Sequence, residues 1–412
     1  DITKYHKCGG ELYWYGCYDS DVYYKQFVTP ESYCFDLDTE ILTLEGWKKV
    51  NEITKKDKVA TLNYLNHNLE YQRIKHISID EYSGKMYYLK TKQVDMLVTP
   101  NHKLYVEVNG IFQLIVVEKL FNEDKLFKKD AKWIGKKIND FSIPSIEIEK
   151  ELLTGNQRIR QKFRLNEIKI FIDYWLKFFG LWIAEGSISK NNVNINNNNK
   201  ELLTEIKILM DGNFKPHLYR HGNGWQLVIC NKQLAEYLRQ FGHAEAKFIP
   251  FWIKKLPSDK LKLFLDYYLK GDGSLRMNKN GKRKRIDAYT ISKKLAGDLQ
   301  EIALKIGMAG NFHIRDRIGK ITKDKFGKEY ITRHKEYTIN FTYQVTPLYK
   351  NKKHKSNLEK WIDYDGVIWC VTTDNGIIYV RRNGKTYWTG NSHPAKISFL
   401  LAERIFKHLE HL

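Results

Sequence analysis

Three residues near the two ends of the 412-residue chain carry groups that can attack a polypeptide backbone. Cys34, in the stretch SYCFDLDTEILT, carries a thiol, and Ser392, in YWTGNSHPAK, carries a hydroxyl. Asn391 lies directly before that serine, and its side-chain amide can attack its own carbonyl carbon. Two nucleophiles and a self-attacking amide at these positions raise the hypothesis of chemistry on the backbone itself. Taken singly, each has an ordinary alternative, since most lone cysteines are small buried hydrophobes.

Two acids in the middle of the chain form a second candidate site. WLKFFGLWIAEGSIS and FLDYYLKGDGSLR both end an apolar run with an acid, a glycine and a serine, and the acids are Glu185 and Asp272. Two carboxylates beside a basic groove make a hard-oxygen site suited to Mg²⁺ bridging a scissile phosphate. An acid before a glycine can also simply end a helix, but two copies with matching surroundings favour the metal site.

The elements around these acids form an internal repeat. Each motif helix is followed by a strand-like segment and an amphipathic helix, KELLTEIKILM in the first copy and KKLAGDLQEIALKIG in the second. The motif helices are apolar nearly all round, which predicts burial. Gly180 and Ala184, one turn apart, allow a second helix to approach closely, and this packing predicts that Glu185 and Asp272 lie side by side.

Short β-rich runs flank the repeated unit on both sides. From Cys34 to about residue 145 they are broken by Gly, Asn and Pro, and from about residue 358 the β character returns. There, Asn383-Gly384 lies between two runs that are typical of a two-residue hairpin. The sequence therefore predicts an all-β domain interrupted by an α/β domain.

The amino-acid composition limits the classes of binding partner and the cellular compartment that we expect for this protein. Lys and Arg number 69 against 48 Asp and Glu, a net charge of +21, and they alternate with 26 Tyr, 20 Phe and 10 Trp. This balance favours nucleic acid as the partner, although a lysine-rich solvated surface would give the same counts. Five scattered cysteines argue against a disulfide framework, and no signal peptide or membrane-spanning run occurs. We expect a soluble, monomeric protein in the reducing cytoplasm.

In order and spacing, these motifs resemble an intein that carries a LAGLIDADG homing endonuclease. The resemblance covers residues 34–391 and rests on motifs in chain order. They are the run from Cys34 to Thr43, the pair Thr99 and His102, the two helices FFGLWIAEG and FLDYYLKGDG with KFIPFWIKKLP between them, and the C-terminal stretches VIWCVTT and RRNGKTYWTGNS. Each motif alone is weak, whereas the ordered set is specific.

The resemblance implies a multidomain fold. An all-β Hint horseshoe splicing domain would be interrupted by an α/β LAGLIDADG endonuclease domain with two pseudo-symmetric αββαββα-like repeats. The expected parts, in chain order, are an N-extein segment 1–33, splicing-domain residues 34–145, the endonuclease 146–352 with repeats at about 168–250 and 251–350, splicing-domain residues 353–391, and a C-extein segment 392–412.

By the same resemblance, splicing needs no cofactor. Cys34 would attack the Tyr33 carbonyl in an N-to-S shift assisted by Thr99 and His102, with His102 protonating the leaving nitrogen. Ser392 would then take the acyl group, Asn391 would cyclise, and Tyr33 would be joined to Ser392.

Two positions in the C-terminal splicing motifs depart from the family pattern. Cys370 stands where an aspartate is more usual, and we expect it to support the reaction. Gly390 stands where many inteins have a histidine, so the group that assists Asn391 is left open.

For the endonuclease, the resemblance implies Mg²⁺ held by Glu185 and Asp272, with Lys247 polarising the attacking water. The substrate would be double-stranded DNA of the empty host allele, spanning the codons of Tyr33 and Ser392. The host protein stays open; SHPAK resembles a segment of some DNA methyltransferases.

Two alternatives remain at this stage. Glu185 in place of Asp and the bulky Tyr267 in the second motif helix allow an intein whose endonuclease has decayed to DNA binding. An ordinary basic nucleic-acid-binding protein without autocatalysis is the other alternative.

Overall fold

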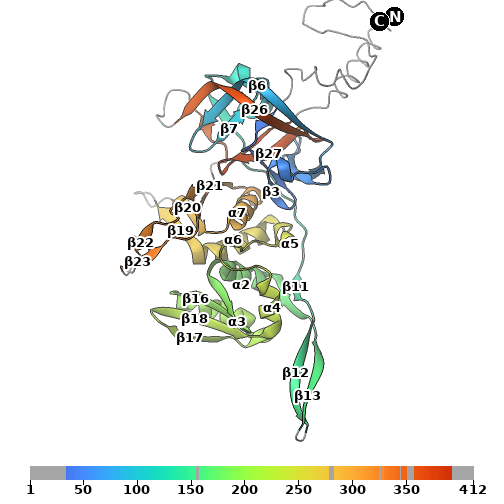
Figure 1. Cartoon of the computed structure of the whole chain (residues 1–412), viewed down its shortest axis with the longest axis vertical. Helices are drawn as coiled ribbons and strands as arrows, with labels where there is room; N and C mark the ends of the chain where they lie inside the picture. The colour runs from blue at the N-terminus through green and yellow to red at the C-terminus, as the bar shows by residue number, and fades with distance from the viewer. Residues whose placement is uncertain are drawn as a thin grey trace, which may run out of the picture.

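The computed structural model describes residues 34–154, 157–277, 283–323, 327, 329–343, 345–349 and 357–391. Its elements form two regions, one built of strands from both ends of the chain and one built from the middle of the chain (Figure 1). Both flanks, 1–33 and 392–412, lie outside the described residues, and so does the predicted nucleophile Ser392. Within the described ranges, no helix is long and apolar enough to span a membrane.

The first region, called the β region here, is made almost entirely of strands. Before the middle of the chain they are β1 (Phe35–Asp36), β2 (Glu40–Thr43), β3 (Gly46–Lys48), β4 (Lys58–Leu62), β5 (Leu69–Arg73), β6 (His76–Lys90), β7 (Asp95–Val98), β8 (Lys103–Val108), β9 (Ile111–Val116) and β10 (Lys125–Phe127), with short 3₁₀ turns at Val50–Glu52 and Val117–Leu120. After it come β25 (Leu348–Tyr349), β26 (Leu358–Thr372), β27 (Ile377–Arg382) and β28 (Lys385–Gly390).

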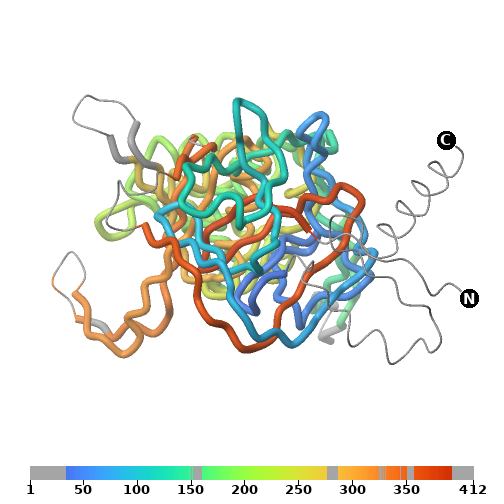
Figure 2. Tube along the Cα trace, turned by 90° about the horizontal axis from the view of Figure 1, so that it is seen from above, coloured from blue at the N-terminus to red at the C-terminus, as the bar shows by residue number. Residues whose placement is uncertain are grey.

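Strands from the two ends of the chain interleave in this region. β1, β26, β6 and β7 close a small barrel, and a larger sheet runs in the order β25-β10-β8-β28-β27-β2-β4-β5. The hairpin β27–β28 therefore lies between β8 and β2, and Figure 2 shows the red C-terminal strands threaded among the blue and cyan ones. Arg382 pairs with Lys385, and Asn383 and Gly384 both have positive φ, which confirms the two-residue hairpin.

The second region, called the middle region here, combines helices and small sheets. Its elements are β11 (Asp140–Ile143), β12 (Ile146–Thr154), β13 (Gln157–Leu165), β14 (Ile168–Phe171), α2 (Ile172–Glu185), β15 (Gly186–Ser189), β16 (Asn192–Asn197), α3 (Lys200–Phe214), β17 (His217–His221), β18 (Gly224–Cys230), α4 (Lys232–Arg239), α5 (Phe251–Lys254), α6 (Ser258–Asp272), β19 (Gly273–Met277), β20 (Arg283–Thr290), α7 (Lys293–Lys305), β21 (Ala309–Arg315), β22 (Ile321–Lys323), β23 (Glu329–Ile331) and β24 (Glu336–Thr342).

The order helix, two strands, helix, two strands occurs twice in the middle region, and in the second copy the hairpin β22–β23 is inserted between the last two strands, β21 and β24. α2 leads into the sheet β15-β16-β18-β17, and α6 leads into the sheet β19-β20-β24-β21. In Figure 1 the two sheets lie on either side of the α2–α6 pair. The long hairpin β12–β13 extends away from both sheets.

Helices α2 and α6 pack closely because glycine stands at their contacts. A Cβ added to Gly180 would lie 2.6 Å from the Phe264 carbonyl oxygen, and one added to Gly271 would lie 2.6 Å from the Ala184 Cβ. Tyr267 does not block this contact, because its hydroxyl hydrogen-bonds Glu205 on α3. The close approach predicted from Gly180 and Ala184 is therefore present.

The structure moves both predicted boundaries of the inserted domain. Phe141 and Ile143 pack in the core of the middle region, and their strand β11 pairs with β14, so that region begins before residue 140 and not at 146. Tyr349 packs in the core of the β region, and its strand β25 pairs with β10, so the middle region ends before residue 348 and not at 352. The physical reason is burial: these apolar residues join the core they can reach, which the local pattern did not reveal.

Helix α7 joins the two regions through buried polar contacts. Gln300 on α7 donates its Nε2 to the Gly384 carbonyl of the β27–β28 turn (2.8 Å). Arg381 on β27 donates to Gln300 Oε1 (2.8 Å) and, through Nε, to Glu40 Oε2 (2.6 Å). Buried polar groups lose their contacts with water and need partners. The hairpin that leads to Asn391 is therefore fixed partly by the middle region.

Candidate active sites

Cys34 is fully buried directly before β1 and is hydrogen-bonded to the segment that follows β7. Its backbone N–H donates to Thr99 Oγ1 (3.1 Å), and the Thr99 N–H donates to the Cys34 carbonyl oxygen (3.2 Å). Two hydrogen bonds in opposite directions fix the peptide unit at Cys34 relative to Thr99. The structure thus brings together two of the residues predicted for the N-terminal reaction.

His102 connects this segment to the C-terminal strand. The ring is buried, its edge meets Phe35 at a centroid distance of 4.7 Å, and Nε2 lies 2.7 Å from Thr389 Oγ1 on β28. Thr389 Oγ1 in turn donates to the Lys103 carbonyl oxygen (3.3 Å). A Thr389 hydroxyl that donates there must accept from Nε2–H, which leaves Nδ1 as the basic nitrogen of the neutral ring.

Asn391 is 2 % exposed and lies against the turn between β26 and β27. Its backbone N–H donates to the Gly376 carbonyl oxygen (3.1 Å). With the amide assigned in the orientation that satisfies its neighbours, Nδ2 also donates to Gly376 O (3.1 Å). Oδ1 then accepts from the Thr373 N–H (2.8 Å) and from Thr373 Oγ1 (2.9 Å). All polar atoms of the side chain are engaged by one turn.

Gly390 has no room for a side chain. An added Cβ would lie 2.8 Å from the Lys103 carbonyl oxygen and 3.2 Å from Leu114 Cδ2. A histidine here would require β8 to shift. The neighbour that assists Asn391 must therefore come from elsewhere in the fold.

Cys370 lies beside Cys34 in the strand register. Phe35 pairs with Trp369 across β1 and β26, and continuing that antiparallel register by one residue sets Cys34 opposite Cys370. Both thiols are fully buried, and Cys370 Sγ contacts the Val371 carbonyl oxygen at 3.4 Å. This position agrees with a supporting role for Cys370.

The two predicted acids end helices α2 and α6, and they affect each other. Burial raises the pKa of Glu185, which accepts a hydrogen bond from Asn197 Nδ2 (3.2 Å). Burial and the nearby Glu185 charge raise the pKa of Asp272 to about 7. A cation between two crowded carboxylates would remove this cost, and carboxylate oxygens are the donors that Mg²⁺ prefers. The residues present therefore fit a divalent cation, with further oxygens needed from water or substrate.

Lys247 is buried beside the acid pair. Its Nζ donates to the carbonyl oxygens of Ile183 (2.9 Å) and Gly186 (2.9 Å), at the C-terminal end of α2. Burial lowers the pKa of Lys247 to about 8, against the opposing charges of Asp272 and Glu185. A lysine held here is close to the acids, as predicted, and it also fixes the end of the helix that carries Glu185.

Thr373 and Thr389 are the site residues that sequence reasoning missed. Thr373 lies in the motif VIWCVTT, and Thr389 lies two residues before Asn391 in the motif RRNGKTYWTGNS. Both residues therefore belong to motifs that the sequence analysis had identified. No spacing rule, however, indicates which hydroxyl meets which partner across a sheet.

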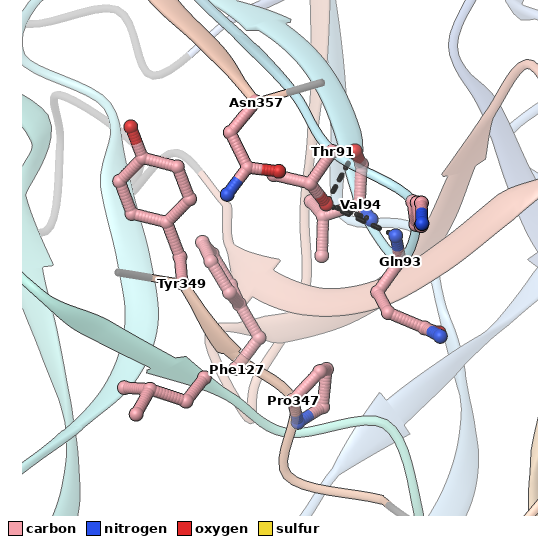
Figure 3. A pocket seen from close by; sticks show the side chains of 9 residues that line it. Thr91, Gln93, Val94, Phe127, Pro347, Tyr349 and Asn357 are labelled. Carbon is pink, nitrogen blue, oxygen red and sulfur yellow. Dashed lines mark hydrogen bonds between the residues drawn. The ribbon is translucent and has the colours of Figure 1, made fainter. Parts of the chain in front are cut away.

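A separate cavity of about 150 Å³ is lined by residues that include Thr91, Phe127 and Tyr349 (Figure 3). Its lining residues do not include Cys34 or Asn391, nor the acids Glu185 and Asp272.

A family model described as "LAGLIDADG-like domain" matches residues 176–242 and 259–339. The first matched segment contains Glu185 and the second contains Asp272. This part of the middle region is therefore similar to a LAGLIDADG-like domain.

Curated proteins with quite different names are similar to most of the chain. A "DNA-directed RNA polymerase subunit beta C-terminal section" of Stigeoclonium helveticum is 29% identical over 92% of this chain and 38% of its own length. An "ATP-dependent Clp protease proteolytic subunit" of Chlamydomonas moewusii is 24% identical over 87% of this chain and 45% of its own length. An "ATP-dependent DNA helicase Hel308" of Thermococcus kodakarensis is 27% identical over 77% of this chain and 32% of its own length. The chain spans less than half the length of these relatives.

Solved structures align over less than half of the chain. A crystal structure of I-DmoI in complex with DNA and Mn covers 42% of this chain and 89% of its own, with 16% identity and a TM-score of 0.28. The structure of an AceL NrdHF class 3 split intein variant covers 48% of this chain and 97% of its own, with 13% identity and a TM-score of 0.22.

Proposed function

We propose that residues 34–391 form an intein that excises itself from its flanks, and that its middle region is a metal-dependent homing endonuclease. One observation carries the first part. Cys34 and Asn391, at opposite ends of the described chain, lie at the two ends of one buried path. The Cys34 N–H donates to Thr99 Oγ1, the His102 N–H donates to the Thr99 carbonyl oxygen (3.0 Å), and His102 Nε2 lies 2.7 Å from Thr389 Oγ1, two residues before Asn391.

The relatives support the same proposal by their lack of a common activity. Similarity over most of one chain recurs in a polymerase subunit, a protease subunit and a helicase, each of which is much longer than the matched part. A segment that occurs within proteins of unrelated function behaves as an insertion. The Hint architecture and the exteins 1–33 and 392–412 belong to this proposal.

The first step is an N-to-S acyl shift at Cys34. Sγ bonds to the Tyr33 carbonyl carbon as its proton passes to Nδ1 of His102; the Tyr33–Cys34 amide bond then breaks, and the same Nδ1 returns the proton to the leaving Cys34 nitrogen. Thr99 Oγ1 holds the Cys34 N–H, which fixes the amide that must break. Thr389 holds Nε2 of His102, so Nδ1 is the nitrogen that exchanges the proton.

The later steps transfer and release the acyl group. Ser392 Oγ attacks the thioester carbonyl, which returns the Cys34 thiol and gives a branched ester. Asn391 Nδ2 then bonds to its own carbonyl carbon, the bond to the Ser392 nitrogen breaks, and a succinimide leaves with residues 34–391. The free Ser392 amine takes the acyl group from its own oxygen, which restores an amide.

For DNA cleavage, Glu185 and Asp272 would hold a divalent cation, which when bound supplies charge neutralisation at the scissile phosphate. Lys247 keeps the end of α2 in position and adds positive charge beside the carboxylates. The sheets on either side of α2 and α6 are the elements that would follow the two halves of a DNA site.

Thiol-induced cleavage tests the splicing proposal. The freshly purified chain incubated with excess dithiothreitol is expected to release a fragment that ends at Tyr33, and a Cys34→Ala variant is not. Absence of that fragment from the unmutated, folded chain would contradict splicing. For the endonuclease, a duplex in which the Tyr33 and Ser392 codons are adjacent should be cut only when Mg²⁺ is added. Tight binding without cutting would favour the decayed endonuclease.

A further inference from the structure

The turn from Thr373 to Gly376 is built to hold one side chain, that of Asn391. Thr373 supplies two donors to the amide oxygen at 2.8 and 2.9 Å, and the Gly376 carbonyl accepts from both nitrogens of Asn391 at 3.1 Å. Thr373 is 4 % exposed and Asn391 is 2 % exposed. Water therefore competes little for these hydrogen bonds.

This turn is itself anchored. Asn375, at its centre, donates its Nδ2 to Thr61 Oγ1 (3.0 Å) and to Glu70 Oε2 (3.0 Å), and its N–H donates to Gln72 Oε1 (3.0 Å). These partners lie on the neighbouring strands β4 and β5. Because the turn is fixed from both sides, it can hold the Asn391 amide in one orientation.

Cyclisation demands this kind of support. An amide nitrogen is a weak nucleophile because its lone pair is delocalised onto oxygen, and it must lose a proton as it attacks. Donors placed on the amide oxygen stabilise the negative charge that collects there when the proton leaves. A fixed side-chain orientation removes the entropy cost of finding the attacking geometry. Gly390 cannot offer a side chain for either purpose.

The structure assigns Thr373 as the positioning residue for cyclisation of Asn391, acting through its hydroxyl and N–H on the amide oxygen. The assignment rests on the proposed splicing function and names the group that takes the place of a side chain at position 390. The bond changes are those of the cyclisation step: Nδ2–C forms, the C–N bond to Ser392 breaks, and one proton passes from Nδ2 to the leaving amine.

The test compares two cleavages in one molecule. In Thr373→Val, which keeps the shape but removes the hydroxyl, succinimide formation at Asn391 is expected to slow at least tenfold, so that branched intermediate accumulates. Thiol-induced release of the Tyr33 fragment should stay within twofold of the unmutated chain. Thr373→Ser restores the hydroxyl and should recover most of the C-terminal rate. Both products are followed by intact mass spectrometry.

Thr91 provides a matched control, because its hydroxyl also serves a turn, donating to the Val94 carbonyl oxygen (3.2 Å) and accepting from the Val94 N–H (2.8 Å). Thr91→Val should leave both cleavages unchanged. The assignment is overturned if Thr373→Val cyclises at the normal rate, if Thr373→Ser is as slow as Thr373→Val, or if both Thr373 variants lose thiol-induced cleavage as well. Failure of the splicing proposal looks different, since the unmutated chain would then show neither cleavage.

Discussion

The site around Cys34 and Asn391, called the junction site here, and the acid pair Glu185 and Asp272 are stabilised by different interactions. Around Cys34 and Asn391, the contacts are hydrogen bonds of 2.7 to 3.1 Å made by Thr99, His102, Thr389 and Thr373. At the acid pair, charge dominates: burial and like charge raise the pKa of Asp272 to about 7. In the proposed mechanism the first site needs no cofactor, whereas the second needs a cation. We therefore expect the two sites to respond to different changes.

The largest expected effect is the loss of DNA cleavage in Asp272→Asn. Removing one of two carboxylates weakens cation binding and leaves Glu185 without its partner, so cleavage of the target duplex should fall about a thousandfold or more. Splicing should continue at its normal rate. Asp259→Asn, at the exposed start of the same helix, is the matched control. Equal loss of splicing in Asp272→Asn would show that the two sites are not independent.

A buried cluster of charged residues on α5 and α7 should control stability in acid. Lys254 and Lys305 bind Glu301, and their charges hold its pKa at about 2, below the ordinary 4.5. A lowered acid pKa stabilises the fold above about pH 4.5, and this contribution is lost as the pH falls toward 2. Burial raises the pKa of Asp298 in the same cluster, which opposes the effect.

Glu301→Gln should therefore cost roughly 3 kcal/mol of unfolding free energy at pH 7. It should also flatten the fall of the melting temperature between pH 5 and pH 3. Calorimetry at several pH values measures both. Glu201→Gln, on the exposed side of α3, is the control. An unchanged pH profile in Glu301→Gln would contradict the role of this carboxylate.

His102→Ala should slow thiol-induced cleavage at Cys34 about a hundredfold, because general acid–base groups contribute at least that much. DNA cleavage should be unaffected, and His76→Ala, on the exposed start of β6, should change neither activity. Gel densitometry of the released fragment over time gives the rate. A normal rate in His102→Ala would remove His102 from the mechanism.

The smallest effect is expected from Lys247→Met. Loss of the hydrogen bonds to Ile183 and Gly186 loosens the end of α2, and loss of the charge leaves the acids more crowded. DNA cleavage should fall about tenfold, as is usual when a residue that positions a metal ligand is removed. Lys255→Met, exposed at the end of α5, should cleave normally. An unchanged rate in Lys247→Met would leave Lys247 a purely structural residue.

Structural features that depend only on residues close together in the chain could be predicted from the sequence. Asn383-Gly384 predicted its hairpin because both residues tolerate positive φ, and Gly180 predicted close helix packing because it lacks a Cβ. The predicted acids end their helices as expected.

Contacts across the fold were not predictable in the same way. That Thr373 meets Asn391 depends on how β26, β27 and β28 align, and Phe141 joins the middle core only because β11 pairs with β14. The contacts of α7 with β27 depend on how two regions dock, and polar residues on a helix otherwise look like a solvated face.

Intact mass spectrometry of the freshly expressed chain tests the central claim most directly. The account predicts a free species of residues 34–391 that ends in the Asn391 succinimide or its hydrolysis product, together with a joined peptide of residues 1–33 and 392–412. An intact 412-residue mass that persists, and that dithiothreitol never cleaves at Tyr33, would contradict it.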